Sequence, residues 1–251
     1  MITSKNNEIV KFIKSLHQKK YRDEHKKYFV EGIKLVKEAI SEEKPINKII
    51  ICESLLNEKV NTKQFEIEYV SKDVFEYISD TKTPQGILAV INMQFNNDIV
   101  KDNTIFALDN IQDPGNLGTI IRTLDCAGIN TLLLSKGTVD LYNPKVIRGT
   151  MGAIYRVNVH ENLNLKEELL KYKKDGYKIV TTDLSATIFH YDLNFNQKLV
   201  IVIGNEANGV SNEIKSIADI KVKIPMLGRT ESLNAGVAAS IIAYEKVRKL
   251  K

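Results

Sequence analysis

Three polar clusters in the second half of the chain constrain its fold most, because each follows a run of strand-like residues. The clusters span residues 113–118, 204–211 and 224–236, and the runs before them span 105–108, 199–203 and 220–224. A buried strand that ends in Gly, Asn and charged residues places polar groups at the carboxyl edge of a sheet, where α/β proteins bind ligands. Three such ends in one domain predict one composite pocket.

The rest of the second half alternates between strand and helix patterns. Further strands are expected at 131–134, 155–159 and 178–182, and helices at 117–127, from Asn143, at 164–174, from Ser211 and at 232–248. Strands separated by helices predict an α/β fold with a mostly parallel sheet and helices on both faces.

The first half predicts a smaller α/β domain. Its patterns indicate helices at 5–20, 32–41 and 73–79, and strands at 28–30, 48–52, 65–70 and 86–91. A polar, unpatterned stretch separates the halves. We therefore expect a small α/β domain at 1–92, a linker at 93–103 and a larger domain at 104–251.

Composition excludes several classes of protein. No run approaches the roughly 20 apolar residues of a membrane helix, so no membrane partner is expected. Cys52 and Cys126 both lie in apolar contexts and are expected to be buried thiols in a reducing cytosol. The four histidines show no ligand spacing with each other or with cysteine, so no metal is expected.

Positive charge is concentrated at the N-terminus. Residues 1–37 hold ten Lys or Arg against four Asp or Glu, a local charge of +6 in a chain whose total is +5. A local basic excess fits contact with a phosphate backbone, and it also fits an ordinary solvated lysine-rich helix face.

A dinucleotide-binding enzyme is one hypothesis for the first polar cluster. Gly115 and Gly118 precede a helix, as in a Rossmann phosphate loop, but the third glycine of that fingerprint is missing. The next strand, 131–135, lacks the terminal acid that would bind a ribose. Both absences disfavour a nucleotide-dependent oxidoreductase.

The three clusters together resemble the signatures of the SpoU (TrmH-type) family, RNA ribose 2′-O-methyltransferases of the knotted SPOUT class that use S-adenosylmethionine. The matching residues are Asn116, Gly118 and Arg122, then Gly204, Glu206 and Gly209, then Pro225, Met226, Gly228, Ser232, Leu233 and Asn234. The resemblance covers residues 104–248, and residues 1–92 resemble more loosely the family's small substrate-binding domain. Ala207, where glycine is common, removes no chemical group on which the activity depends.

The resemblance implies a catalytic set made of Arg122, Asn116, Glu206, Ser232 and Asn234. Methyl transfer depends on positioning the ribose hydroxyl in line with the sulfonium methyl group. Arg122 is expected to stabilise the developing alkoxide and a nearby phosphate. Proton abstraction by Arg122 is the weaker alternative, because a guanidinium stays protonated. Asn116 and Ser232 are also candidates for helix N-caps.

The same resemblance implies the binding residues. For S-adenosylmethionine these are Gly204, Ile224, Leu233, Glu206 and Thr182, and for RNA they are Lys11, Lys14, Lys19, Lys20, Lys145 and Arg148. Gly204 has no Cβ, so a ligand is expected to approach its main chain closely. A homodimer and a trefoil knot are implied by the family alone.

The sequence therefore predicts a cytoplasmic enzyme that methylates a ribose 2′-hydroxyl of structured RNA, with 23S ribosomal RNA as the first candidate substrate. Two alternatives stay open at this point. The substrate is instead transfer RNA, or the chain is a non-catalytic module that binds RNA or protects against an antibiotic.

Overall fold

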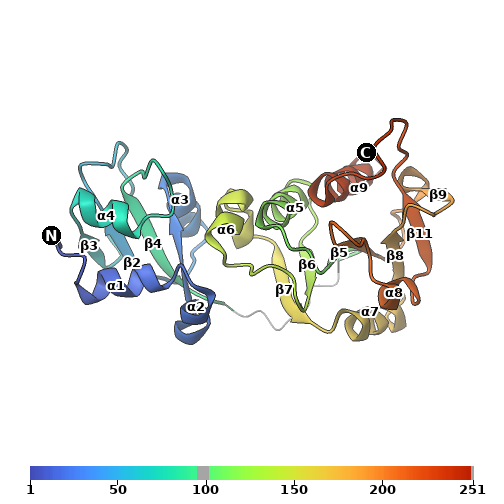
Figure 1. The fold of residues 1–251 in the computed structure, drawn as a ribbon, viewed down its shortest axis with the longest axis horizontal. Coiled ribbons are helices and arrows are strands. Elements are labelled where there is room, and N and C mark those ends of the chain that lie inside the picture. Colours follow the sequence, from blue (N-terminus) through green and yellow to red (C-terminus); the bar gives the residue numbers. More distant parts are fainter. Residues whose placement is uncertain (95–101, 250–251) are drawn as a thin grey trace. The chain divides into compact units, whose positions relative to one another are not determined.

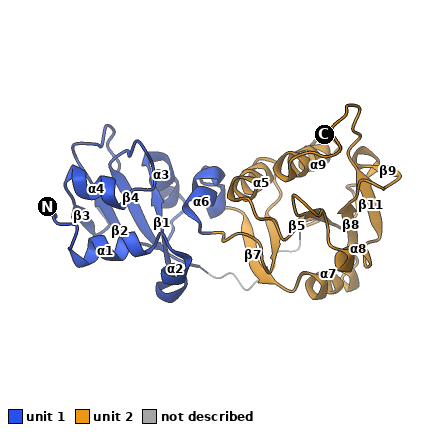
Figure 2. Cartoon of the chain, in the orientation of Figure 1, with its two compact units in different colours: residues 1–95, 142–155 blue, residues 96–141, 156–251 orange. Residues whose placement is uncertain are grey.

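The computed structural model describes residues 1–94 and 102–249 (Figure 1). The chain divides into two compact units, Met1–Phe95 with Tyr142–Tyr155, and Asn96–Leu141 with Arg156–Lys251 (Figure 2). The expected linker at 93–103 falls largely on residues 95–101, which lie outside the described residues, so the predicted domain limits stay a prediction. The packing adds that residues 142–155 belong with the first unit.

The first unit is a four-stranded mixed sheet with helices on both faces. Its strands, in the spatial order β1-β4-β2-β3, are β1 (Lys27–Glu31), β4 (Ile87–Asn92), β2 (Ile46–Ile51) and β3 (Ile67–Tyr69). Its helices are α1 (Glu8–Ser15), α2 (Lys19–His25), α3 (Ile33–Ser41), α4 (Lys72–Ile78), α6 (Pro144–Thr150) and the short η1 (Ala153–Tyr155).

Two apolar cores lie on opposite faces of this sheet. Ile49 of β2 belongs to the core that contains Val36 of α3 and Ile147 of α6. Ile50, the next residue, belongs to the core that contains Val10 of α1 and Val74 of α4. Successive strand residues point to opposite faces, so a strand covered on both sides is apolar throughout.

Residues 5–20, expected to form one helix, form α1 and only the first two residues of α2, with a break between them. Asn7 begins α1, since its side chain accepts a hydrogen bond from the Ile9 amide at 2.9 Å. After α1 ends, the His17 ring nitrogen Nε2 lies 2.7 Å from the Ile78 carbonyl oxygen, which ties the break to the end of α4. Consequently Lys11 and Lys14 lie on one helix and Lys19 and Lys20 on another.

The second unit is built on a seven-stranded sheet whose neighbouring strands are all parallel. The spatial order is β7 (Asn158–Leu163), β6 (Thr131–Ser135), β5 (Thr104–Asp109), β10 (Leu199–Gly204), β8 (Lys178–Thr182), β11 (Ile220–Lys223) and β9 (Ile188–Phe189). The prediction of a mostly parallel sheet is confirmed.

Helices cover both faces of this sheet. Figure 1 shows α5 (Pro114–Cys126) and α9 (Ala235–Lys249) on one side, and α7 (Leu165–Lys174) and α8 (Asn212–Lys215) on the other. The short η2 (His190–Asp192) follows β9 and contacts α9. The cysteine prediction is half right, since Cys52 is buried but Cys126, in the last turn of α5, is exposed.

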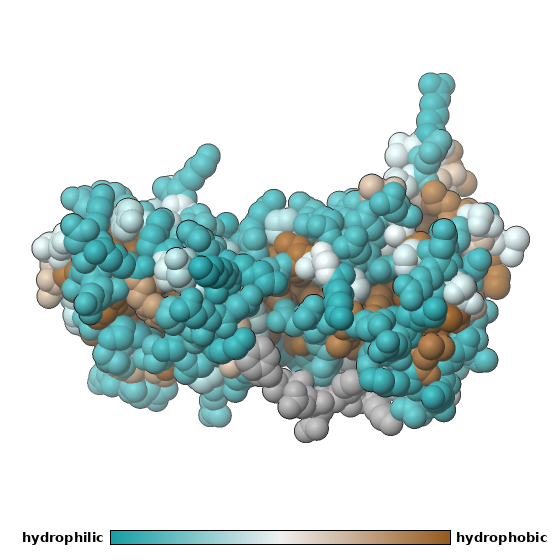
Figure 3. Space-filling view, turned by 60° about the horizontal axis from the view of Figure 1, so that its bottom comes forward, coloured by the Kyte–Doolittle hydropathy of each residue, from teal (hydrophilic) through white to brown (hydrophobic). Residues whose placement is uncertain are grey.

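The surface is mainly hydrophilic in the view of Figure 3, and apolar side chains gather in separate patches on the second unit. Within the described residues, no helix is both long and apolar enough to cross a bilayer.

A buried carboxylate at the end of β1 fixes the loop that follows α4. Glu31 is 6% exposed. Its Oε1 accepts hydrogen bonds from the hydroxyls of Ser79 and Thr81, both at 2.6 Å, and its Oε2 accepts one from the Asp80 amide at 2.9 Å. A buried charge is tolerated only when it is hydrogen-bonded, so these three donors hold the loop against the sheet.

Replacing Glu31 with Ala removes the acceptor for all three donors. We expect the free energy of unfolding to fall by about 2–4 kcal/mol, measured by urea denaturation. Glu66→Ala is the matched control, because Glu66 pairs with Lys48 at the surface and its side chain is 64% exposed. That control is expected to cost less than about 1 kcal/mol. Equal losses in the two variants would contradict the role given to Glu31.

Candidate active site

The carboxyl ends of the central strands bring the three polar clusters together. β5, β10, β8 and β11 are consecutive in the parallel sheet, and Gly204 at the end of β10 pairs with Asp109 at the end of β5. A cavity of about 380 Å³ opens at this edge, between β8, β10, β11, the loop after β11 and the start of α9. Six of the residues predicted to be catalytic or to bind the cofactor line it: Thr182, Gly204, Glu206, Ile224, Ser232 and Leu233.

Three predicted catalytic residues form one hydrogen-bonded chain beside this cavity. The Asn116 side-chain amide donates to Glu206 Oε1 at 2.7 Å. The amide nitrogen of Asn234 donates to Asn116 Oδ1 at 2.8 Å. Asn116 is 6% exposed. The two hydrogen bonds hold its side-chain amide in place. The chain thus joins α5, the loop after β10 and the start of α9.

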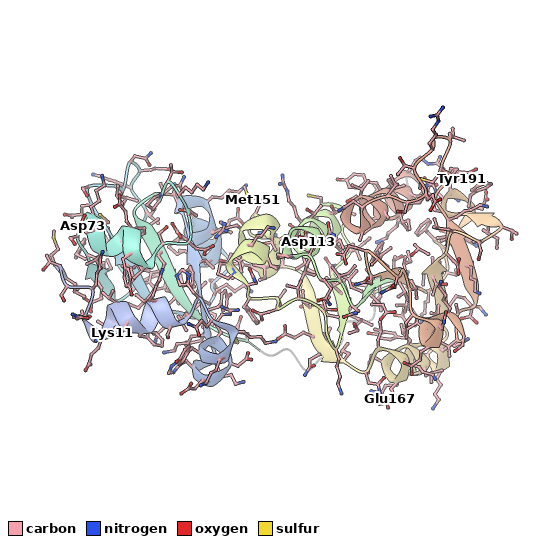
Figure 4. The ribbon with its side chains drawn as sticks, viewed as in Figure 1. Lys11, Asp73, Asp113, Met151, Glu167 and Tyr191 are labelled. Carbon is pink, nitrogen blue, oxygen red and sulfur yellow. The ribbon has the colours of Figure 1, made fainter. Side chains whose placement is uncertain are left out.

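The surroundings of Glu206 favour the ionised form of its carboxyl group. Burial raises the pKa of its carboxyl group, but hydrogen bonds from the Asn116 side chain and from the amides of Gln112 and Asp113 outweigh this, and the net pKa lies below the ordinary value. Those two amides belong to the turn before α5. This turn contains Asp113, which Figure 4 labels. Glu206 therefore supplies hydrogen-bond acceptors for the two amides of this turn.

The helix caps differ from those expected. Asp113, not Asn116, caps α5, and its Oδ1 accepts from the Asn116 amide at 2.8 Å. The terminal helix begins at Ala235 instead of Ser232, and Asn234 caps it by accepting from the Gly236 and Val237 amides. Asn116 is thereby free to use its side chain for Glu206 and Asn234, and Ser232 lies exposed on the cavity wall.

The structure gives a reason for a glycine at 204 besides the predicted approach of a ligand. A Cβ at Gly204 would lie 2.0 Å from the Val210 nitrogen and 2.1 Å from the Gly209 carbonyl carbon. The close approach comes from the protein's own main chain, where Asn205 and Gly209 exchange two hydrogen bonds of 3.0 and 2.9 Å. Gly204 still lines the cavity, so it makes this turn possible and leaves main-chain groups accessible there.

Arg122 lies apart from the cavity lining. It is exposed and follows Asn116 by six residues on α5, which places it about 9 Å further along the helix axis and on a different side. Asn234 and Asn116 are not lining residues either, but the hydrogen-bonded chain links both to Glu206. The structure therefore brings together all the predicted catalytic residues except Arg122.

The six residues predicted to bind RNA belong to the first unit and do not share one environment. Lys14 donates to the Tyr77 carbonyl oxygen at 2.7 Å, and Lys20 lies over the Tyr21 ring. Arg148 forms an ion pair with Asp80. Lys11, Lys19 and Lys145 are exposed.

Asp183 is a cavity residue that the sequence reasoning missed. It follows β8 directly, and its Oδ2 lies 3.4 Å from Lys215 Nζ. A hydrogen bond from the Ser185 amide is the largest cause that keeps the pKa of Asp183 below its ordinary value. The acid that directly follows the predicted strand 178–182 was the available signal, because a strand-end carboxylate suits ribose hydroxyls in α/β folds.

Comparison with known proteins agrees with this geometry. A family model described as the SpoU rRNA Methylase family matches residues 103–244, and one described as an MRM3-like substrate binding domain matches residues 7–89. The chain belongs to the SpoU rRNA methylase family. The family resemblance stated from the three clusters is thus confirmed.

Individual SpoU relatives match nearly the whole chain. It is 32% identical to the 23S rRNA (guanosine(2553)-2′-O)-methyltransferase RlmP of Bacillus subtilis, over 97% of both chains. It is 31% identical to a TrmH family tRNA/rRNA methyltransferase of Staphylococcus epidermidis, over 87% of this chain and 94% of that protein. The AdoMet-bound rRNA methyltransferase from Sinorhizobium meliloti has a similar structure, with a TM-score of 0.89, 29% identity and coverage of 100% and 98%.

Removing the Asn116 side chain should alter the titration of Glu206. In Asn116→Ala we expect the pKa of the Glu206 carboxyl to rise, because a donor to its charged form is lost. The ordinary value is 4.5, and the depressed folded-state pKa contributes stability that is present above it and lost as the pH falls through the folded-state value. The variant should therefore lose less stability than the wild type on acidification below pH 4.5.

Carbon-13 NMR titration of the Glu206 carboxyl and urea denaturation at neutral and acid pH measure both effects. Asn208→Ala is the control, since it changes an asparagine in the same loop whose side chain is not a donor to Glu206. An unchanged Glu206 titration in Asn116→Ala would refute the hydrogen-bonded chain.

Proposed function

We propose that this protein transfers a methyl group from S-adenosylmethionine to a ribose 2′-hydroxyl of 23S ribosomal RNA. The observation that carries the proposal is the chain Glu206–Asn116–Asn234, which joins the three SpoU motifs at one cavity. The name of the Bacillus subtilis relative supports the reaction and the ribosomal substrate. Transfer RNA is the second candidate, because the name of the staphylococcal relative includes both RNAs.

The cavity suits S-adenosylmethionine in size and chemistry. Its volume of about 380 Å³ falls within the roughly 300–1,000 Å³ of small-ligand sites. Leu184, Ile224 and Leu233 supply apolar walls for a purine, and Asp183 supplies a carboxylate for sugar hydroxyls. When bound, the cofactor supplies an electrophilic methyl group on a sulfonium.

We assign positioning to the hydrogen-bonded chain and charge stabilisation to Arg122. Glu206 and Asn234 fix the amide of Asn116, which keeps α5 and the start of α9 in register at the cavity edge. A fixed geometry lowers the entropic cost of bringing hydroxyl and methyl group together. The guanidinium of Arg122 stabilises the alkoxide that develops on the ribose, and the proton leaves to water.

Methyl transfer tests the proposal directly. We expect wild-type protein to transfer labelled methyl from S-adenosylmethionine to a 23S ribosomal RNA transcript in a single turnover, at a ribose oxygen mapped by alkaline-resistant linkages. Arg122→Ala is expected to reduce the rate at least about 100-fold while folding and cofactor affinity survive, since the lost group acts on transition-state charge. Transfer only to transfer RNA would select the second candidate, and no transfer to either RNA would leave a non-catalytic module.

We also propose a cytoplasmic homodimer, because Arg122 does not line the cavity of its own chain. Val237 and Tyr244 on the outer side of α9 are 45% and 51% exposed, and α5 packs directly against α9. Exposed apolar residues beside Arg122's helix fit a face covered by a second copy, which would bring each Arg122 toward the partner's cavity.

The family's trefoil knot remains a proposal, supported by the return of α9 to pack on α5. The cytoplasmic location follows from the proposed ribosomal substrate.

A charge at the proposed dimer face should separate the copies. We expect Tyr244→Asp to convert a dimer to a monomer in analytical ultracentrifugation and to lose methyl transfer, because a carboxylate is buried without a partner. Tyr69→Asp is the control, since Tyr69 is 40% exposed on the first unit. A wild-type monomer with full activity would refute the dimer proposal.

A further inference from the structure

The first unit contains a groove that the proposed active site does not use. A cavity of about 310 Å³ lies between the start of α3, the loop after α4 and the end of α6. A second cavity of about 460 Å³ lies against α3 and the segment near Glu58. Both cavities are lined by Lys34 and Gln85, so they form two parts of one groove across the start of α3.

The groove presents hydrogen-bond donors that the protein does not use. Lys34 is exposed, and its ammonium has no hydrogen-bond or ion-pair partner among residues 1–94 and 102–249; the same is true of Lys82 in the adjoining loop. The Gln85 side-chain oxygen accepts from the Ile33 amide at 2.9 Å. This bond turns the Gln85 NH₂ group, a donor pair, away from the helix.

An apolar side chain completes the groove. Met151 follows α6, is 38% exposed and lines the smaller cavity. Its backbone is left-handed, with φ 52°, and it caps α6 (Figure 4). A thioether makes favourable contacts with aromatic rings, so an exposed Met beside lysines suits a planar base attached to a phosphate.

The loop that forms one wall is fixed before any ligand arrives. Glu31 lines the smaller cavity and holds Ser79, Asp80 and Thr81 through the hydrogen bonds described above. Two other lysines of this unit are engaged locally, Lys14 with the Tyr77 carbonyl oxygen and Lys37 with Glu58. Lys34 and Lys82 are therefore better placed for an external anion than Lys14 is.

We propose that this groove binds one unpaired nucleotide of the RNA substrate. Lys34 and Lys82 contact phosphates, the base packs against Met151, and the Gln85 NH₂ group donates to the base edge. Unpaired nucleotides are recognised in this way because their faces and edges are accessible, while phosphate contacts supply affinity. The inference rests on the proposed RNA substrate and assigns its contacts on the first unit to the α3 groove, in preference to the α1 and α2 lysines.

Salt-dependent RNA binding separates the two surfaces. Three double variants each remove two positive charges from the whole chain. They are Lys34→Ala in the groove with Lys82→Ala in the adjoining loop, Lys11→Ala with Lys19→Ala on α1 and α2, and Lys59→Ala with Lys63→Ala as a control outside both cavities. The affinity for the 23S transcript is measured by fluorescence anisotropy at several salt concentrations. S-adenosylmethionine affinity is measured by calorimetry to show that the second unit is intact.

The groove variant is expected to bind RNA at least tenfold more weakly and to lose about 0.7 in salt slope for each lost phosphate contact, with unchanged cofactor affinity. Met151→Asn, which tolerates the left-handed backbone, is expected to weaken binding without changing the slope, because it removes an uncharged base contact. If the salt slope of RNA binding falls only in the α1 and α2 variant, or in no variant, the proposal that the groove binds RNA is overturned. A wild type that neither binds nor methylates RNA would overturn the proposed function itself.

Discussion

The ionised carboxylate of Glu206 sets the direction of every hydrogen bond that joins the three motifs. A carboxylate only accepts, so Asn116 must turn its NH₂ group toward Glu206 and its oxygen toward Asn234. Asn234 must then donate with its nitrogen, which leaves its oxygen for the amides that begin α9. One charge thus fixes the orientation of the buried Asn116 amide, of the exposed Asn234 amide and of the start of the terminal helix.

The same principle operates in the first unit, with another outcome. Glu31 is buried at the end of β1 and accepts from three donors of a polar loop, as Glu206 does from the turn before α5. In both units a carboxylate near a strand end makes an irregular segment rigid. Rigid segments lose little entropy when a ligand binds, which suits surfaces that must hold RNA or cofactor in one geometry.

The sequence predicted the fold class and the composite pocket because both follow from strand ends. Parallel strands share one carboxyl edge, so polar residues after β5, β10 and β11 had to meet there. The break between α1 and α2 was not predictable from periodicity, because it depends on a contact between His17 and the end of α4, 61 residues away. Likewise, Gly204 is required by its own turn, which only the folded main chain reveals.

The sequence by itself determined most of the helices and strands and which chemical groups gather at the sheet edge, since hydrophobic period and motif order are local properties. Only the tertiary structure decided what those groups do. It gave Asn116 a bridging role and Asn234 the cap, and it placed Asp183 in the cavity. It also left Arg122 outside the cavity lining. These outcomes depend on distances between residues far apart in the chain, and hydrogen bonds respond to distance and direction instead of sequence order.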